Sequence, residues 1–140
     1  MRLFALTVVV GLLATPIAAD ERDIGAHLDI ELNATQQAEA GCQLTFVAVN
    51  GHAAEVEQAV FETVLFKSDG AVDRLTLFDF GALPPGLPRV RQFVVQGLQC
   101  AELGRLLING VHACRAPDVP GDACGEGLTV SSRIAVGLIG

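Results

Sequence analysis

The stretch that decides the fold runs from Val60 to Phe80 and reads VFETVLFKSDGAVDRLTLFDF. Its two arms are rich in β-branched and aromatic residues, which favour strands. Between the arms, Ser68-Asp69-Gly70 has the composition of a tight turn. The stretch therefore predicts a hairpin, with one strand from about Val56 to Lys67 and its partner from Val72 to Phe80. Both faces of these strands carry apolar residues, which indicates central strands or an apolar outer face that a partner covers.

Outward from this hairpin, shorter runs alternate apolar and polar residues with a period near two, the pattern of half-buried strands. The first run places Leu28, Ile30 and Leu32 on one face and acidic residues on the other. Thr35 to Gly41 follows as a polar turn. Further strands are expected at Cys42 to Asn50, Arg89 to Gln96, Arg105 to Ile108 and Leu128 to Leu138. Seven such strands predict an all-β fold, an immunoglobulin-like or fibronectin type III-like antiparallel β-sandwich.

Turn residues separate these runs. The dipeptides Asn50-Gly51 and Asn109-Gly110 predict turns. Leu83 to Pro88 must be a loop, because its prolines lack the amide donors that a central strand needs. Ala101 to Gly104 is expected to form a helical turn, and Arg115 to Gly127 a mobile loop.

The N-terminus has the pattern of a secretory signal peptide. One positive charge at Arg2 precedes an apolar run from Leu3 to Leu13, which is too short to span a bilayer. The small residues Ala18 and Ala19 predict cleavage after Ala19. The expected mature chain is a single β-sandwich domain, residues 20–140, located in the periplasm or secreted, with no membrane span after cleavage.

The charge of the chain argues against nucleic-acid partners. Cleavage removes Arg2 and keeps all 16 acidic residues, which takes the formal net charge from -7 to -8. Binding to a phosphate backbone depends on Lys and Arg side chains that neutralise phosphates. An acidic surface instead keeps the protein soluble.

The four cysteines are Cys42, Cys100, Cys114 and Cys124. An even number of cysteines in an exported chain predicts two disulfides, for which three pairings are possible. We favour Cys42 with Cys100 and Cys114 with Cys124, because the second pair closes a short Pro/Gly/Asp loop that has little else to order it.

Two segments carry a resemblance to known proteins: Val60 to Gly70 and Phe78 to Gly86, the second containing Leu83-Pro84-Pro85-Gly86. Together they resemble exported bacterial immunoglobulin-like domains. From about Leu28 onward, cysteines included, the chain resembles a family of small uncharacterised exported proteins of alphaproteobacteria. This resemblance implies a sandwich fold and a periplasmic location, and it implies no active site.

No residue pattern predicts catalysis. The histidines His27, His52 and His112 lie far apart in sequence, and surface positions are their expected places. Ser131-Ser132 has no nucleophile-elbow context. The carboxylates show neither a glycosidase pair nor a calcium loop. We therefore expect neither enzymatic activity nor a cofactor or metal.

The predicted function is that of a periplasmic accessory or interaction module, whose partner is another periplasmic or envelope protein. Edge strands can accept a partner strand, and two loops, Leu83 to Pro88 and Cys114 to Cys124, are the candidate contact surfaces. The alternative is an enzyme or metal-binding protein whose site forms near His112 and Cys114 in the folded chain.

Overall fold

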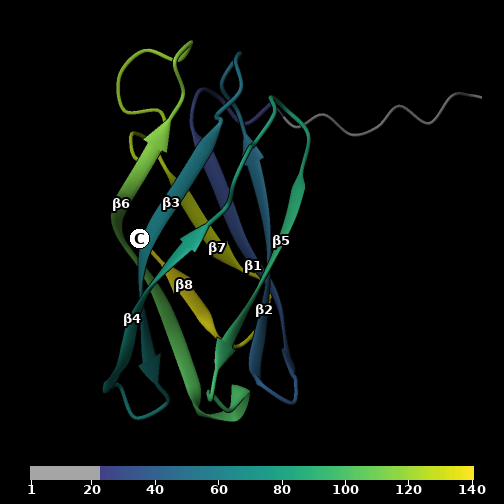
Figure 1. Cartoon of the computed structure of the whole chain (residues 1–140), viewed down its shortest axis with the longest axis vertical. Coiled ribbons are helices and arrows are strands. Elements are labelled where there is room, and N and C mark those ends of the chain that lie inside the picture. The colour runs from purple at the N-terminus through teal and green to yellow at the C-terminus, as the bar shows by residue number, and fades with distance from the viewer. Residues whose placement is uncertain (1–22) are drawn as a thin grey trace, which may run out of the picture.

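The computed structural model describes residues 23–140, which form two four-stranded sheets packed face to face (Figure 1). The first, here called the β2 sheet, has the strand order β5-β2-β1-β7. The second, the β3 sheet, has the order β4-β3-β6-β8. The strands are β1 (Leu28–Gln37), β2 (Gly41–Asn50), β3 (Gln58–Lys67), β4 (Val72–Asp79), β5 (Arg89–Gln96), β6 (Leu103–Arg115), β7 (Thr129–Ser132) and β8 (Gly137–Ile139), with a short 3-10 turn, η1 (Cys100–Glu102).

This architecture confirms the predicted all-β sandwich. The neighbours β1-β2-β5 and β3-β6 have the A-B-E and C-F strand order of immunoglobulin domains, but β8 runs parallel to β6, whereas immunoglobulin sheets are antiparallel. The predicted signal peptide, residues 1–19, lies outside the described residues.

The hairpin that the sequence predicted joins β3 to β4, with Phe61 opposite Phe78 and Leu65 opposite Arg74. Gly70 occupies its turn at φ +90°, a conformation that side-chain-bearing residues rarely adopt. Alternate residues of β3 point inward and are buried, whereas the residues between them face the outside of the sheet.

Aromatic side chains fill the space between the sheets. The rings of Phe46, Phe78, Phe80 and Phe93 contact one another, and Phe61 packs edge-on against Phe80. The Phe78 and Phe93 rings stack 4.5 Å apart between β4 and β5, the two strands that flank one side of the sandwich. Inward residues from both sheets thus share one core.

Two disulfides fix this core, and they have the favoured pairing. Cys42 in β2 bonds to Cys100 in η1, immediately before β6, so this bond ties one sheet to the other. Cys114 at the end of β6 bonds to Cys124 in the loop that follows. The first pair spans 58 residues of sequence and the second only 10.

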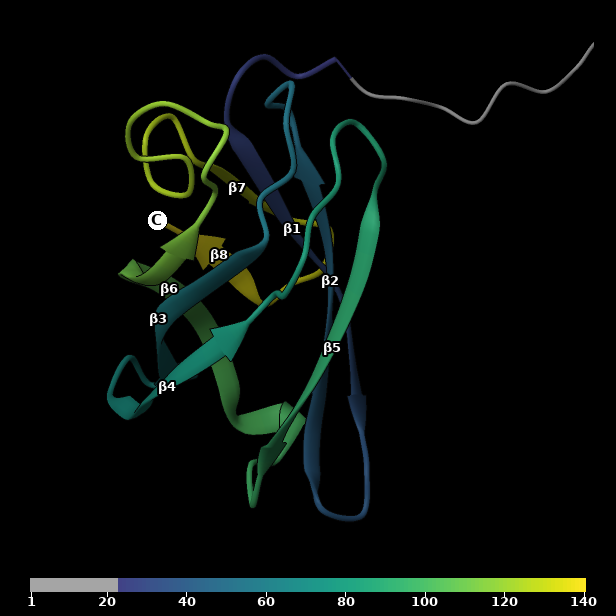
Figure 2. The same ribbon diagram turned by 45° about the horizontal axis from the view of Figure 1, so that its top comes forward.

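The prediction of one last strand, Leu128 to Leu138, is wrong. This segment forms two short strands in different sheets: β7 pairs in parallel with β1, and β8 pairs in parallel with β6. Between them the chain crosses from one sheet to the other, and across this bend the Ser132 hydroxyl donates to the Val136 carbonyl and accepts from the Ile134 backbone amide. The sandwich therefore has eight strands and two mixed sheets (Figure 2).

The predicted turn Thr35 to Gly41 is shorter than expected, because β1 and β2 take its first and last residues, and the predicted turn at Asn109-Gly110 is wrong. β1 continues to Gln37 past a register shift between Leu32 and Ala34. β6 continues through Asn109-Gly110, where the register with β3 shifts again and the Asn109 amide donates to Glu62 Oε1 at 2.6 Å. At Asn109-Gly110, pairing with β3 through a β-bulge overrides the local turn preference.

Candidate functional site

Three loops gather at one end of the sandwich: residues 51–57, residues 80–88 and residues 116–128 (Figure 2). The two loops predicted as contact surfaces, residues 83–88 and the Cys114–Cys124 loop, are therefore neighbours of the same central loop. The sequence does not reveal this grouping, because the sheet topology decides which connections share an end.

A buried asparagine holds the first two loops together. Asn50, which is fully buried, donates from Nδ2 to the Ala54 and Leu83 carbonyls at 2.9 and 2.8 Å. Its Oδ1 accepts from the His52 backbone amide at 2.9 Å, and its carbonyl accepts from Gly86 N. The Asn-Gly dipeptide had indicated only a turn, so the role of Asn50 as a connector between loops was missed.

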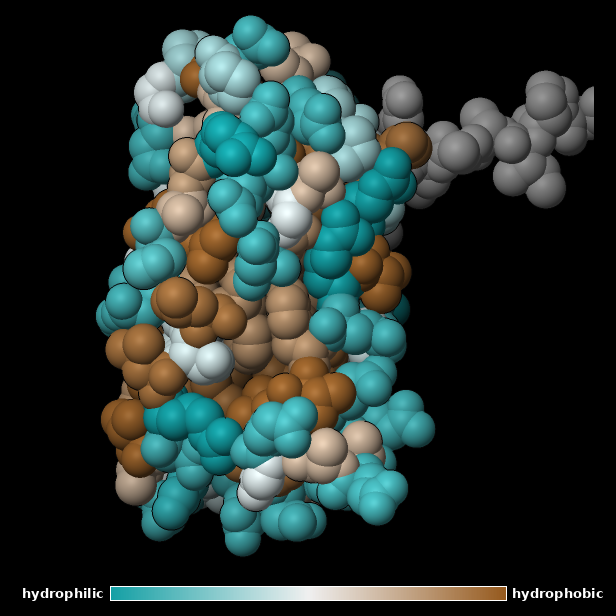
Figure 3. Space-filling view, viewed as in Figure 1, coloured by the Kyte–Doolittle hydropathy of each residue, from teal (hydrophilic) through white to brown (hydrophobic). Residues whose placement is uncertain are grey.

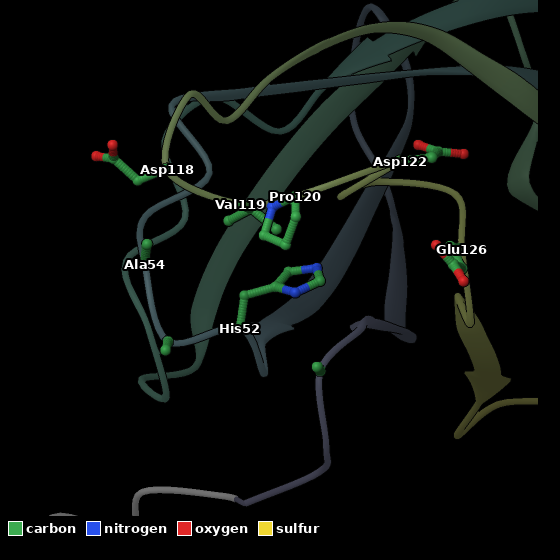
Figure 4. Close-up of a pocket in the computed structure, with 9 residues that line it drawn as sticks. His52, Ala54, Asp118, Val119, Pro120, Asp122 and Glu126 are labelled. Atoms are coloured by element: carbon green, nitrogen blue, oxygen red, sulfur yellow. The ribbon is translucent and has the colours of Figure 1, made fainter.

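His52 joins the third loop to this group. Its Nε2 lies 2.7 Å from the Ala123 carbonyl, and Ala123 itself is buried against the core. Figure 4 shows the imidazole beneath Pro120, at the wall of a cavity of about 400 Å³. The other cavity walls include Ala54 and Val119, so the lining near the ring is mainly apolar.

Three carboxylates, Asp118, Asp122 and Glu126, also belong to the cavity lining. The Asp118 side chain points away from the His52 ring, and Asp122 Oδ1 accepts from the Gly125 amide at 2.9 Å to shape its own loop (Figure 4). Within residues 23–140, no group of three or more His, Cys, Asp or Glu side chains is arranged to hold a metal ion.

The alternative site near His112 loses its sulfur ligand. Cys114 is bonded to Cys124, so it offers no thiolate to a metal or a substrate. His112 is exposed near the end of β6. His27 precedes β1 and His52 lies in the central loop, and the three histidines do not form a metal-binding group within the described part of the chain.

The outer face of the β3 sheet is apolar. One row crosses all four strands in register: Leu75 lies opposite Val64, Val64 opposite Leu107, and Leu107 opposite Ile139. Leu75 is 54% exposed and Ile139 is 45% exposed. Figure 3 shows hydrophobic residues gathered over the part of the surface where β4 lies.

The neighbouring positions extend this apolar face. Val72, 59% exposed, lies opposite Phe66, and the Arg105 guanidinium stacks 4.9 Å from the centre of the Phe66 ring. On the other side of the row, Leu77 is 45% exposed and lies opposite Glu62. We call these residues the β3-sheet face: Val64, Phe66, Val72, Leu75, Leu77, Leu107 and Ile139.

Each sheet has an edge strand with an arginine at an inward position: β4 in the β3 sheet and β5 in the β2 sheet. Arg74 of β4 lies opposite buried Leu65 and donates to Asp73 and to the Gln96 carbonyl. Arg91 of β5 lies opposite buried Phe46 and donates to the Phe80 and Ala82 carbonyls. Inward-pointing charges are a device that protects sheet edges from pairing with other strands.

No family model, curated protein or solved structure matches this chain in comparisons with known proteins. Among residues 23–140, no helix has the length and apolar character needed to cross a membrane. The two disulfides are consistent with an oxidising compartment outside the cytoplasm.

Proposed function

We propose that this chain is a periplasmic interaction module, of the exported alphaproteobacterial family it resembles, and that it binds another envelope protein through the β3-sheet face. The observation that supports this most directly is the apolar row Leu75–Val64–Leu107–Ile139, whose two end residues are exposed and whose two middle residues are half-buried. Contiguous apolar patches on soluble proteins mark interaction sites more often than isolated apolar side chains do.

The β3-sheet face has enough exposed apolar surface for a specific contact. Its most exposed members are Val72, Leu75, Leu77 and Ile139, at 45% to 59% exposure. Fully burying one such side chain contributes about 1.5–3 kcal/mol, so covering the exposed halves of these four contributes roughly 4 kcal/mol. An equal contribution from the partner would be of the size needed to offset the entropy cost of association, about 4–15 kcal/mol.

Charge favours a basic partner over a second copy of the chain. The formal net charge is -7 for the full sequence, which opposes self-association. Locally, Glu62 lies opposite Leu77, and Asp79 follows it two residues later on the same side of β4. A surface with apolar side chains flanked by Lys or Arg would complement both the row and these carboxylates.

The arginines on the two edges favour contact through the face over strand addition. A partner strand beside β4 or β5 would have to displace Arg74 or Arg91 from carbonyl oxygens that they already bind. A partner that packs on the β3-sheet face leaves both arginines in place. The proposed contact is therefore made by the side chains of that face and not by backbone pairing at an edge strand.

Site-specific photo-crosslinking in living cells tests this proposal. A photoreactive residue at Leu75 should crosslink to one discrete, basic envelope protein. The matched position is Val90, 57% exposed on the outer face of the other sheet, which should give no such product. Crosslinking from Pro85 or Pro120 in place of Leu75 would assign the contact to the loop end and contradict the proposal.

The purified partner then allows a quantitative test. Leu75→Gln with Leu77→Gln should weaken binding about tenfold or more, from the loss of buried apolar surface, and raising the salt concentration should weaken it further. The control pair Val90→Gln with Val94→Gln should leave the affinity unchanged. Equal affinities for both double variants would rule out the β3-sheet face.

A further inference from the structure

The two disulfides differ in what they hold together. Cys42–Cys100 connects the two sheets, because Cys42 belongs to β2 and Cys100 immediately precedes β6. Cys114–Cys124 connects the end of β6 only to the loop that follows it. Opening the second bond therefore leaves both sheets and their connection intact.

The two disulfides also differ in access. Cys42 has no exposed surface and Cys100 is partly buried against the core. Cys114 is an exposed residue, whereas its partner Cys124 is fully buried. Thiol–disulfide exchange requires an attacking thiolate to reach one sulfur, so access to Cys114 decides which bond reacts first.

We propose that Cys114–Cys124 is an exchangeable disulfide that a dithiol reductant opens in the folded protein while Cys42–Cys100 stays closed. The reductant's thiolate attacks Cys114 Sγ, forms a mixed disulfide there and displaces Cys124 as the leaving thiolate, which takes up a proton. The second thiol of the reductant, as its thiolate, then attacks the reductant sulfur that is bonded to Cys114. This closes the disulfide of the reductant and releases Cys114, which takes up a proton. The reductant is oxidised to its disulfide, and the protein gains two thiols.

The position of Cys124 favours this order of events. Because Cys124 is fully buried, the attacking thiolate reaches the bond from the side of Cys114, an exposed residue. The Cys124 sulfur also lies 3.9 Å from the Gln58 carbonyl, to which a new S–H can donate. This carbonyl can hold Cys124 as a thiol once the bond is open, and Cys114 is the member of the pair that belongs to an exposed residue.

Opening this bond releases residues 116–128 from β6. The remaining contacts of the loop include that of His52 Nε2 with the Ala123 carbonyl and the packing of apolar loop residues such as Val119 and Ala123 on the core. Because Val119 and Pro120 line the cavity beside His52, release of the loop opens that cavity. Cys114–Cys124 thus restrains residues 116–128 against the end of β6 and keeps the cavity beside His52 closed.

The test exposes the purified folded protein to a monothiol, reduced glutathione, and then blocks free thiols by alkylation. Peptide mapping should find glutathione on Cys114 and the alkyl group on Cys124, with Cys42–Cys100 intact. Dithiothreitol should open Cys114–Cys124 at least about tenfold faster than Cys42–Cys100, because exchange follows access to sulfur. Far-UV circular dichroism should not change, while amide hydrogen exchange should rise within residues 116–128.

The double variant Cys114→Ser/Cys124→Ser is the matched control. It should show the raised hydrogen exchange without any reductant and accept no glutathione at its remaining cysteines. The wild-type mapping decides the question even if this variant folds poorly. Equal opening of both disulfides, glutathione on Cys100, or no reduction before global unfolding would each overturn the proposal.

Discussion

The outer faces of the two sheets differ in a way that their inner faces do not. In the β2 sheet, Val90 and Val94 are separated by Gln92, and the residues opposite Gln92 and Val94 are Thr45 and Gln43. In the β3 sheet, an unbroken apolar row crosses four strands. Both inner faces, by contrast, contribute fully buried side chains to one core.

This difference separates residues that hold the fold from residues that are free for another use. The β2 sheet shows that this sandwich tolerates a polar outer face. The apolar residues of the β3-sheet face lie outside the shared core, which is the basis for our proposal that a partner covers them.

The largest expected effect contrasts two phenylalanines on β3. Phe61 points inward and is fully buried, whereas Phe66 lies on the outer face under Arg105. Phe61→Ala should lower the free energy of unfolding by about 3–5 kcal/mol through the cavity it leaves. Phe66→Ala should cost less than about half of that, because its ring is not enclosed. Denaturant unfolding of the oxidised protein measures both, and equal losses would break the distinction between the two faces.

A smaller effect of opposite sign is expected for Thr63. The Thr63 hydroxyl is buried at an inward position of β3, with no hydrogen-bond partner within the described residues. Thr63→Val removes this unsatisfied group at nearly constant shape and should stabilise the protein by about 1 kcal/mol.

The control is Thr45 on the outer face of the β2 sheet, whose hydroxyl accepts from Gln92 at 3.1 Å. Thr45→Val should change the free energy of unfolding by less than about 0.5 kcal/mol. Destabilisation by Thr63→Val, measured by the same unfolding experiment, would show that its hydroxyl is satisfied after all.

The smallest expected effect sharpens the contrast between the faces. Leu75→Gln should change the stability of the isolated protein by less than about 0.5 kcal/mol, because an exposed outer-face side chain contributes little to the fold. It should also reduce the fluorescence of a hydrophobic dye bound to the native protein, whereas Gln92→Ala should not. A large loss of stability from Leu75→Gln would make the β3-sheet face structural.

Local pattern predicted the strands that carry a clear apolar–polar alternation or a tight turn between β-branched arms. The β3–β4 hairpin followed from its β-branched arms and Ser68-Asp69-Gly70, and β5 was predicted with its observed bounds. Asn109-Gly110 misled, because pairing of β6 with β3 outweighs the preference of that dipeptide for a turn. The last strand was misassigned because its two halves follow partners in different sheets, which only the assembled fold supplies.

The sequence predicted the candidate sites less completely than it predicted the strands. Apolar residues on both faces of the Val60–Phe80 stretch did indicate an outer face that a partner covers, as one of two readings. The row itself requires the register among four strands, including the late strand β8. The place of Asn50 between two loops depends on contacts 33 residues apart, which no local signal records.

The segment that forms β7 and β8 has a consequence for how fast this chain folds. Asp29 of β1 pairs with Thr129 of β7, about 100 residues later, and Leu106 of β6 pairs with Leu138 of β8. Neither sheet is complete until this one segment has joined both, so we expect the two sheets to form and unfold together. Contacts of such high sequence separation place the protein among slow folders, on the order of milliseconds to seconds.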